Sequence, residues 1–435
     1  MDALAKHAKR YPDLAPLAVD ESGLSTRDAA LAHAILDQTI RRWITLTFLL
    51  ELRLKRPLQQ HAPSVQAALL AGAAQLTVFD RLPAYAVIDE TVEWVKSRHG
   101  RKSSGLVNAV LRRVMEMMAP QDDANRRREH WTNARDELPL PNAGAVALRE
   151  PILPEHPVER LAVATGLPPA MLTHLSRDKT FDEVRQFALH GLQRPPSILN
   201  ASHATAPLPE SCKSKHDMPG HVVFQGPHAE LASLLQGRSD IWAQDPTSSA
   251  ACLLASGLSP KVAIDMCAGQ GTKTRQLRAL FPHAQIVATD TNAERMKTLK
   301  GVFQRDDRVQ TIEFRSLNNW IGKADLVLID APCSNSGVLA RRPEARHRWS
   351  TATIDSLVSV QRQILADSQR LLAPGARILY ATCSVDRREN DMQAEWLVKW
   401  HHMRIARSES RWPAGGPGQP DALSHDGGFA ALLES

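Results

Sequence analysis

Two cysteines in the second half of the chain have surroundings that suit a reactive thiol. Cys333 lies in the stretch DAPCSNSG and Cys383 in YATCSVDRREN, and each follows an apolar run. A single cysteine is usually a small buried hydrophobe, but two at the ends of neighbouring runs favour thiolate chemistry. Asp386 and Glu389 have the spacing of a capping box, which predicts a helix continuing to about Trp400. A helix that starts there would put Cys383 in positive potential, which stabilises a thiolate.

A glycine-bearing turn, DMCAGQGTKT, follows an earlier apolar run. Gly269 and Gly271 permit a tight turn and the close approach of a ligand to backbone N–H groups. Asp290 comes 19 residues after Gly271, and an acid at about that spacing binds ribose hydroxyls in doubly wound sheets. Thr272 and Thr274 replace glycines of the phosphate-loop and dinucleotide motifs, so both motifs are disfavoured. A plain strand-to-helix turn, with Asp290 as a helix cap, stays open on these residues alone.

The elements that must position these residues can be read from the alternation of patterns after Asp245. Short apolar runs, often β-branched, are separated by helical stretches; the runs are KVAIDMCA, QIVATD, TIEFR, DLVLID and RILYAT. This alternation predicts parallel strands buried on both faces of a doubly wound α/β sheet. Ligands of such sheets bind beyond the carboxyl ends of the strands. Residues 245–435 are therefore predicted to form one α/β domain, with the glycine turn and both cysteines at the same edge.

The first half of the chain has apolar residues at helical spacing. We assign residues 1–120 to an all-α domain of about five helices, with turns at Pro57, Pro63, Pro83 and Gly100. Residues 121–157 are rich in Pro, Asn, Asp and Arg and are interpreted as a linker, in which Arg126–Arg128 form a solvated charged run. Residues 158–244 are predicted to form a small mixed α/β subdomain.

The composition is that of a globular multidomain protein. Of its residues, 43% are hydrophobic and 23% are charged. A chain of 435 residues is too long for one ordinary core. Its five cysteines lack metal or disulfide spacing, and no window resembles a signal peptide or a membrane span, so a cytoplasmic location is expected. The net charge of +6 favours a nucleic-acid partner. Residues 1–120 carry +4 of this charge, from 16 Lys and Arg against 12 Asp and Glu.

The cysteine motifs resemble those of the cytosine-C5 RNA methyltransferases, which use S-adenosyl-L-methionine. DAPCSNSGVLARRP and YATCSVDRREN match that family closely, DMCAGQGTKT resembles its cofactor loop, and DGGF resembles its last strand. RLPAYAVIDETVEW and GLVNAVLRR resemble the NusB-like domain of enzymes of the RsmB (Sun/Fmu) type. The resemblance implies an all-α NusB-like RNA-binding domain and a Rossmann-like S-adenosylmethionine-dependent methyltransferase domain with a mostly parallel sheet. It also implies methylation of a cytosine in 16S ribosomal RNA.

The resemblance implies a role for each motif residue. Cys383 would attack C6 of the cytosine, Cys333 would assist proton removal and release, and Asp330 would hold the edge of the base. The residues expected to bind the cofactor are Cys267, Ala268, Gly269, Gln270, Gly271, Thr272, Lys273, Asp290, Ser316 and Asp330. Ser316 is included because the acid that the family places after the third strand is missing from EFRSLNNW. Weak cofactor binding is therefore expected.

RNA is expected to contact the helical half, the 158–244 subdomain and four arginines beside the cysteine motif: Arg341, Arg342, Arg346 and Arg348. Trp349 is interpreted as a core residue rather than a base-stacking one. No metal or membrane partner is expected, and the protein is expected to be a monomer. One alternative is an rRNA-binding or assembly factor without catalysis, but the two retained cysteines argue against it. The other is a DNA cytosine methyltransferase with Cys333 as nucleophile, but the NusB-like half argues against it.

Overall fold

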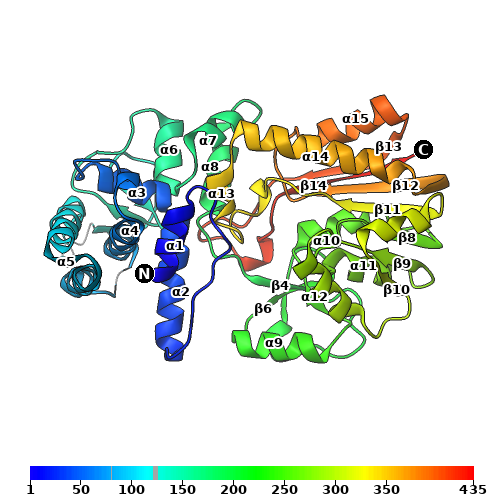
Figure 1. The fold of residues 1–435 in the computed structure, drawn as a ribbon, viewed down its shortest axis with the longest axis horizontal. Coiled ribbons are helices and arrows are strands. Elements are labelled where there is room, and N and C mark those ends of the chain that lie inside the picture. Colours follow the sequence, from blue (N-terminus) through cyan, green and yellow to red (C-terminus); the bar gives the residue numbers. More distant parts are fainter. Residues whose placement is uncertain (80, 121–125) are drawn as a thin grey trace. The chain divides into compact units, whose positions relative to one another are not determined.

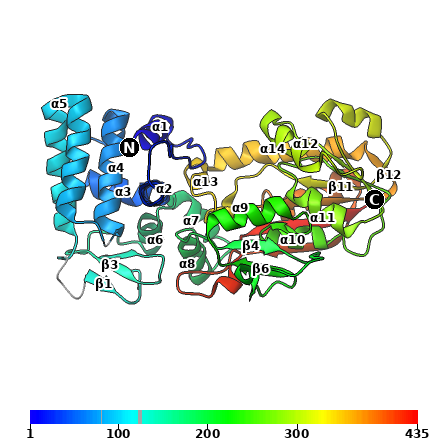
Figure 2. The same ribbon diagram turned by 90° about the horizontal axis from the view of Figure 1, so that it is seen from below.

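The computed structural model describes residues 1–79, 81–120 and 126–435 (Figures 1 and 2). The chain forms two compact units. We call them the helical unit, which comprises Met1–Arg194, Leu339–Ser350 and Gly416–Gly418, and the sheet unit, which comprises Pro195–Val338, Thr351–Gly415 and Gln419–Ser435. No helix of the described residues is long and apolar enough to cross a membrane.

The first part of the helical unit is all-α, as predicted. Its helices are α1 (Asp2–Arg10), α2 (Thr26–Arg41), α3 (Trp43–Glu51), α4 (Pro63–Val78) and α5 (Ala84–Met117), with a short 3₁₀ segment, η1 (Leu58–Gln60). Ser25 caps α2 by accepting the N–H of Asp28, and Pro63 opens α4. Gly100 interrupts α5 with a φ of 72°. Twelve of the 16 residues of α4 are buried, so this apolar helix forms the centre of the core.

The prediction of a linker over residues 121–157 is wrong for its described part; residues 121–125 lie outside the described residues. An antiparallel sheet of order β1-β3-β2 forms there, from β1 (Arg127–Arg128), β2 (Glu137–Pro139) and β3 (Ala145–Ala147). The sheet lies next to the end of α5 (Figure 2). The N–H of Ala119, two residues after this helix, donates to the carbonyl of Ala147 in β3. The solvated-run interpretation also fails. Arg126 is buried, and Arg128 pairs with Asp136 at 2.7 Å.

The predicted subdomain at 158–244 is divided between the two units. Helices α6 (Pro157–Thr165), α7 (Pro169–Leu175) and α8 (Phe181–His190) belong to the helical unit. The sheet unit begins with a four-stranded sheet of order β5-β6-β4-β7 and one helix, built from β4 (Ser197–Asn200), β5 (Ser214–Lys215), β6 (His221–Phe224), α9 (His228–Gly237) and β7 (Trp242–Ala243). The change of pattern at Asp245 therefore did not mark a boundary between compact units.

The large sheet of the sheet unit confirms the predicted α/β fold. Its strand order is β10-β9-β8-β11-β12-β14-β13, and the first five of these strands are parallel. The strands are β8 (Val262–Asp265), β9 (Gln285–Ala288), β10 (Val309–Thr311), β11 (Ala324–Asp330), β12 (Leu372–Thr382), β13 (Arg404–Arg411) and β14 (Gly428–Glu434). The prediction that TIEFR forms the third strand is only partly right, because β10 ends at Thr311 and a 3₁₀ segment, η4 (Phe314–Trp320), follows.

Helices cover both faces of this sheet (Figure 1). Leu365 and Leu397, from α14 (Thr351–Gln369) and α15 (Asp391–His401), pack on one face with Val327. Leu277 and Leu299, from α11 (Thr272–Leu280) and α12 (Ala293–Phe303), pack on the other, next to α10 (Pro246–Leu253). The chain order reverses at β8, so the crevice for a ligand lies at the carboxyl ends of β8 and β11.

Candidate active site

The loop after β8 is folded as a cradle for a ligand. Gly271 has a φ of 91° and is the N-cap of α11, and a Cβ there would meet the ring of Phe303 at 2.6 Å. Gly269 also has positive φ, and its N–H donates to Oδ2 of Asp290 over 2.9 Å. Asp290 does not cap α12, because Asn292 is the N-cap of that helix. The carboxylate of Asp290 thus ties the glycine turn to the loop after β9.

Three charged side chains lie behind this turn. Asp265, at the end of β8, is fully buried and accepts a hydrogen bond from Thr274 over 2.7 Å, while its Oδ1 has no hydrogen-bond partner among the described residues. Burial raises the pKa of Asp265 to about 7. Lys273 Nζ lies 2.8 Å from Oδ2 of Asp330, at the end of β11. Burial alone would lower the pKa of Lys273, but the charge of Asp330 raises it above its ordinary value.

The raised pKa of Asp265 predicts a pH-dependent stability. In the unfolded chain an aspartate titrates near pH 4, so between about pH 4 and 7 the folded state binds the extra proton and stability falls as pH rises. We expect Asp265→Asn, which keeps an acceptor for Thr274, to remove this slope. Denaturant midpoints of the unaltered protein and the variant at pH 5 and pH 8 measure this slope. The prediction is contradicted if the midpoint difference between the two pH values is the same in both proteins.

The structure brings the two cysteines together. Cys333 follows β11 and Cys383 follows β12, and their Sγ atoms are 3.2 Å apart. A hydrogen bond with Cys383, together with burial, raises the pKa of Cys333 well above its ordinary value. Asn335, which the sequence did not single out, accepts from Cys383 Sγ over 3.3 Å and donates to the carbonyl of Cys333 over 3.0 Å. Cys333 is thus held as a thiol beside the more exposed sulfur of Cys383.

The capping box predicted at Asp386 and Glu389 is wrong. Helix α15 begins only at Asp391, so its N-terminus does not follow Cys383 directly. Asp386 instead accepts from Arg388 over 2.8 Å, and Glu389 is turned into the interior. The donors that bind the two acids, local for Asp386 and partly distant in sequence for Glu389, compete with capping. The predicted end of this helix near Trp400 is confirmed by its last residue, His401.

The DGGF motif supports the loop of Cys383. The N–H of Gly337 donates to the carbonyl of Cys383 over 2.9 Å, and the N–H of Gly427 donates to the carbonyl of Gly337 over 2.8 Å. A Cβ at Gly337 would lie 2.3 Å from the carbonyl oxygen of Gly427, so only glycine fits. Lys273, Cys383 and Asp426 line a small cavity of about 40 Å³ beside these glycines.

The comparisons with known proteins agree with this geometry. A family model described as "16S rRNA methyltransferase RsmB/F" matches residues 255–433, and the NusB family model matches residues 3–116. The chain combines an RsmB/F methyltransferase domain with a NusB domain. S-adenosyl-L-methionine, the predicted cofactor, is therefore confirmed as the cofactor of this methyltransferase domain.

Two named relatives match this chain over nearly its full length. The "Ribosomal RNA small subunit methyltransferase B" of Xanthomonas campestris pv. campestris is 29% identical over 94% of this chain and 89% of that protein. The protein of the same name from Shigella flexneri is 26% identical over 94% of this chain and 91% of its own length. The crystal structure of PH0851 shares the fold, with a TM-score of 0.73 at 19% identity over 95% of this chain and 91% of that one.

The residues at the end of β8 fit the cofactor of the RsmB/F family. Three features together form a polar cradle suited to an adenosine. They are the Asp265 oxygen that has no hydrogen-bond partner among the described residues, the turn at Gly271, where a side chain would clash with Phe303, and the carboxylate of Asp290. Four other predicted residues lie in the same turn or at the start of α11: Cys267, Ala268, Gln270 and Thr272. Ser316 lies in η4, after β10.

One predicted RNA contact, Arg346, is wrong. Its side chain is fully buried, and its guanidinium donates to the carbonyls of Arg41 (2.7 Å), Thr165 (3.3 Å) and Gly191 (2.6 Å). These residues lie at the C-termini of α2, α6 and α8, where the last carbonyls lack partners within their helices. Burial lowers the pKa of Arg346 to about 9. A cation that closes three helix ends in this way cannot reach a phosphate.

The other predicted RNA contacts divide by exposure. Arg341 and Arg342 are exposed, while Arg348 is half-buried and donates to the carbonyl of Leu14 over 3.4 Å. Trp349 is buried, with its ring centroid 5.6 Å from that of His174, which confirms the core interpretation. Only the first two arginines therefore retain the exposure that the RNA prediction requires.

Arg346→Ala is expected to destabilise the protein by at least about 3 kcal/mol, because several buried carbonyls lose their donor at once. Arg342→Ala, an exposed arginine of the same segment, is the matched control and should change stability by less than about 0.5 kcal/mol. Equilibrium unfolding of both variants tests this. Equal unfolding midpoints for Arg346→Ala and Arg342→Ala would show that the buried guanidinium does not stabilise these helix ends.

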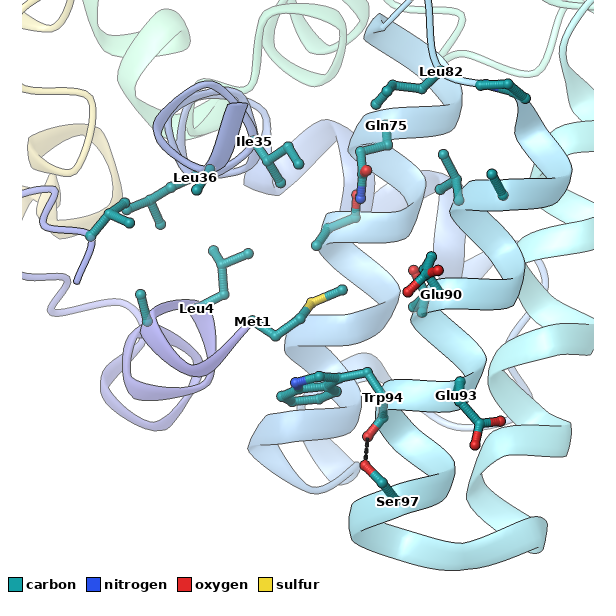
Figure 3. A pocket seen from close by; sticks show the side chains of 18 residues that line it. Met1, Leu4, Ile35, Leu36, Gln75, Leu82, Glu90, Glu93, Trp94 and Ser97 are labelled. Carbon is teal, nitrogen blue, oxygen red and sulfur yellow. Dashed lines mark hydrogen bonds between the residues drawn. The ribbon is translucent and has the colours of Figure 1, made fainter. Parts of the chain in front are cut away.

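A second cavity belongs to the helical unit and has a volume of about 630 Å³ (Figure 3). Side chains of α1, α2, α4 and α5 line it, including Leu4, Leu36, Gln75 and Trp94, and Glu90 also lies on its wall (Figure 3). The residues that line it in the described part of the chain include none of the predicted site residues.

Proposed function

We propose that this chain methylates C5 of a cytosine in 16S ribosomal RNA, through a covalent bond between Cys383 Sγ and C6 of the base. The observation that carries this proposal is the contact of 3.2 Å between the sulfurs of Cys333 and Cys383 at the sheet edge that holds the cofactor cradle. A binding protein needs neither thiol. An enzyme that must first attack and then release a base needs a nucleophile and a second group beside it.

Cys383 supplies the nucleophile. Its thiolate forms an S–C6 bond, and the electron pair of the C5=C6 double bond makes C5 nucleophilic. S-adenosylmethionine, when bound, supplies an electrophilic methyl group on a sulfonium. Loss of the C5 proton to a solvent base then restores the C5=C6 double bond and breaks the S–C6 bond, so that the thiolate of Cys383 leaves. The bond from the methyl group to C5 would replace its bond to the sulfonium, which would leave as a neutral thioether.

Cys333 is assigned to release. Its raised pKa keeps it a thiol, and at 3.2 Å it can donate a hydrogen bond to the sulfur of Cys383 as that sulfur regains negative charge. Asp330 is assigned to the polar edge of the base, where an ionised carboxylate accepts from the N4 amino group and from N3–H of the adduct. The ammonium group of Lys273, 2.8 Å from Oδ2 of Asp330, holds this carboxylate in place at the end of β11.

The finer contacts of the cofactor are also part of the proposal. Asp290 is assigned to the ribose hydroxyls, and residues 267–273 to the rest of the cradle, with Asp265 behind them. Ser316 takes the place of an acid, and a neutral hydroxyl forms a weaker hydrogen bond than a carboxylate does. A modest affinity for S-adenosylmethionine is therefore expected.

Methyl transfer to defined RNA tests the function. The chain is incubated with S-adenosylmethionine and either naked 16S RNA or small ribosomal subunits that lack the modification, and 5-methylcytosine is mapped by bisulfite sequencing. One newly protected cytosine is the expected result. Cofactor binding without methylation of either substrate would overturn the proposal and favour a catalytically silent rRNA-binding or assembly factor.

RNA binding is expected to depend steeply on salt, because the candidate contacts are the exposed arginines Arg341 and Arg342 and basic residues of the helical unit. With about five phosphates contacted, the slope of log K against log salt concentration should be near −3.5 for a single-stranded target. Filter binding or fluorescence anisotropy at several salt concentrations measures it. An affinity independent of salt would refute the electrostatic account.

A further inference from the structure

Glu389 is a buried acid that joins the loops of the two cysteines. Its side chain is completely buried, and its Oε2 accepts from the hydroxyls of Ser334 and Ser384, each over 2.6 Å. Its Oε1 accepts from the N–H of Ser334 over 2.9 Å and from the amide of Gln361 over 3.2 Å. One carboxylate thus collects four donors from three separate segments of the sheet unit.

The two serines stand at equivalent places. Ser334 directly follows Cys333, and Ser384 directly follows Cys383. A third hydroxyl, that of Ser336, lies 3.1 Å from the hydroxyl of Ser334 and 3.0 Å from that of Ser384. We call Glu389 with these three serines the carboxylate clasp.

The clasp connects the two cysteine loops beyond the last paired residues of β11 and β12. The strand pairing of β11 with β12 ends at Asp330 and Ala381, before either cysteine is reached. Asn390 supports one side only, since it accepts from Thr382 over 2.5 Å and donates to the carbonyl of Ser384 over 2.9 Å. Glu389 spans both loops, so it is well placed to set their separation.

We propose that Glu389 is a positioning residue that fixes the contact between the sulfurs of Cys333 and Cys383; the link to catalysis rests on the function proposed above. Reactions between held groups are sensitive to placement, and a shift of about 1 Å can cost on the order of 100-fold in rate. Glu389 itself does not touch the base. It acts through the serines that flank the two thiols.

Geometry and charge can be separated by substitution. In Glu389→Gln the amide oxygen can keep the bonds of Oε1, and the amide NH₂ can donate to both serine hydroxyls, because a hydroxyl can accept as well as donate. The clasp then survives without its charge. In Glu389→Ala it is lost. A positioning role therefore predicts rescue by glutamine, whereas a role in proton transfer predicts that glutamine and alanine fail alike.

The first measurement is single-turnover methylation of the target RNA by the full chain. Glu389→Gln should stay within about threefold of the unaltered protein, and Glu389→Ala should fall about 100-fold. Ser334→Ala and Ser384→Ala, which each remove one hydroxyl, should lose less than Glu389→Ala, and their effects should not add to it because all three belong to one network. Glu395→Ala, at an exposed position of α15, is the matched control with unchanged rate.

The second measurement needs no RNA and judges the clasp even if methylation is absent. Diamide oxidises two adjacent thiols to a disulfide, and mass spectrometry follows the bond between Cys333 and Cys383. Glu389→Ala should slow this bond at least about tenfold, while Glu389→Gln and Glu395→Ala match the unaltered protein. Equal disulfide rates in all variants would overturn the inference, as would glutamine failing together with alanine in methylation. An inactive unaltered protein with a slow Glu389→Ala disulfide would instead overturn the proposed function alone.

Discussion

Cys383→Ala is expected to abolish methyl transfer to RNA and, with it, any covalent species between protein and RNA. The substitution removes the sulfur that would attack C6, and nothing else activates C5 of a neutral cytosine. Cys333 cannot replace it, because its hydrogen bond with Cys383 and its burial raise its pKa and keep it protonated. Transfer of a labelled methyl group and a denaturing gel of protein with RNA measure both losses.

Binding must survive for this result to carry weight. The cofactor cradle lies at the ends of β8 and β9, so calorimetry should show S-adenosylmethionine bound by Cys383→Ala as by the unaltered protein. Cys212→Ala, a buried cysteine of the small sheet region, is the matched control and should keep full activity. A covalent adduct that persists in Cys383→Ala would assign the attack to Cys333, as in the DNA-type alternative.

The sheet could be predicted because its strands leave a continuous record in the chain. The segments Val262–Asp265 and Ala324–Asp330 are mostly apolar, since both faces of the sheet are covered by helices. The third strand was misplaced because β10 is an edge strand whose Gln310 faces solvent, which weakens its apolar pattern. The strands of residues 127–147 are two or three residues long, too short to show any period.

The chemistry could be predicted only as far as residue type and motif reach. Cys333 and Cys383 could be placed at one edge because each follows a strand, but the groups that hold them could not be predicted. Glu389 has the spacing of a helix cap, and only the fold reveals that its partner is Ser334, 55 residues away. Arg346 reads as a surface arginine beside the cysteine motif, yet one of its partners, Arg41, lies 305 residues away in the chain. Long-range partners of this kind are not recorded in local sequence.

Cys333→Ala is expected to trap the reaction after methyl transfer. The attacking sulfur of Cys383 remains, so the S–C6 bond still forms, but the thiol 3.2 Å from it, which assists release, is gone. Each tenfold slowing of release needs only about 1.4 kcal/mol of lost transition-state stabilisation. Protein should therefore accumulate on RNA as a thioether that survives a denaturing gel, at least about tenfold above the unaltered protein.

The pattern across both cysteine variants decides how the roles are divided. Cys333→Ser keeps a hydroxyl where the thiol stood, so it should release RNA faster than Cys333→Ala if a hydrogen-bond donor beside Cys383 is what matters. The double variant Cys333→Ala/Cys383→Ala should form no adduct, because the trapped species depends on the sulfur of Cys383. An adduct in Cys383→Ala but none in Cys333→Ala would exchange the two roles. Adducts in neither variant, with methylation abolished only by Cys383→Ala, would place Cys333 outside the release step and leave its burial beside Cys383 a matter of packing.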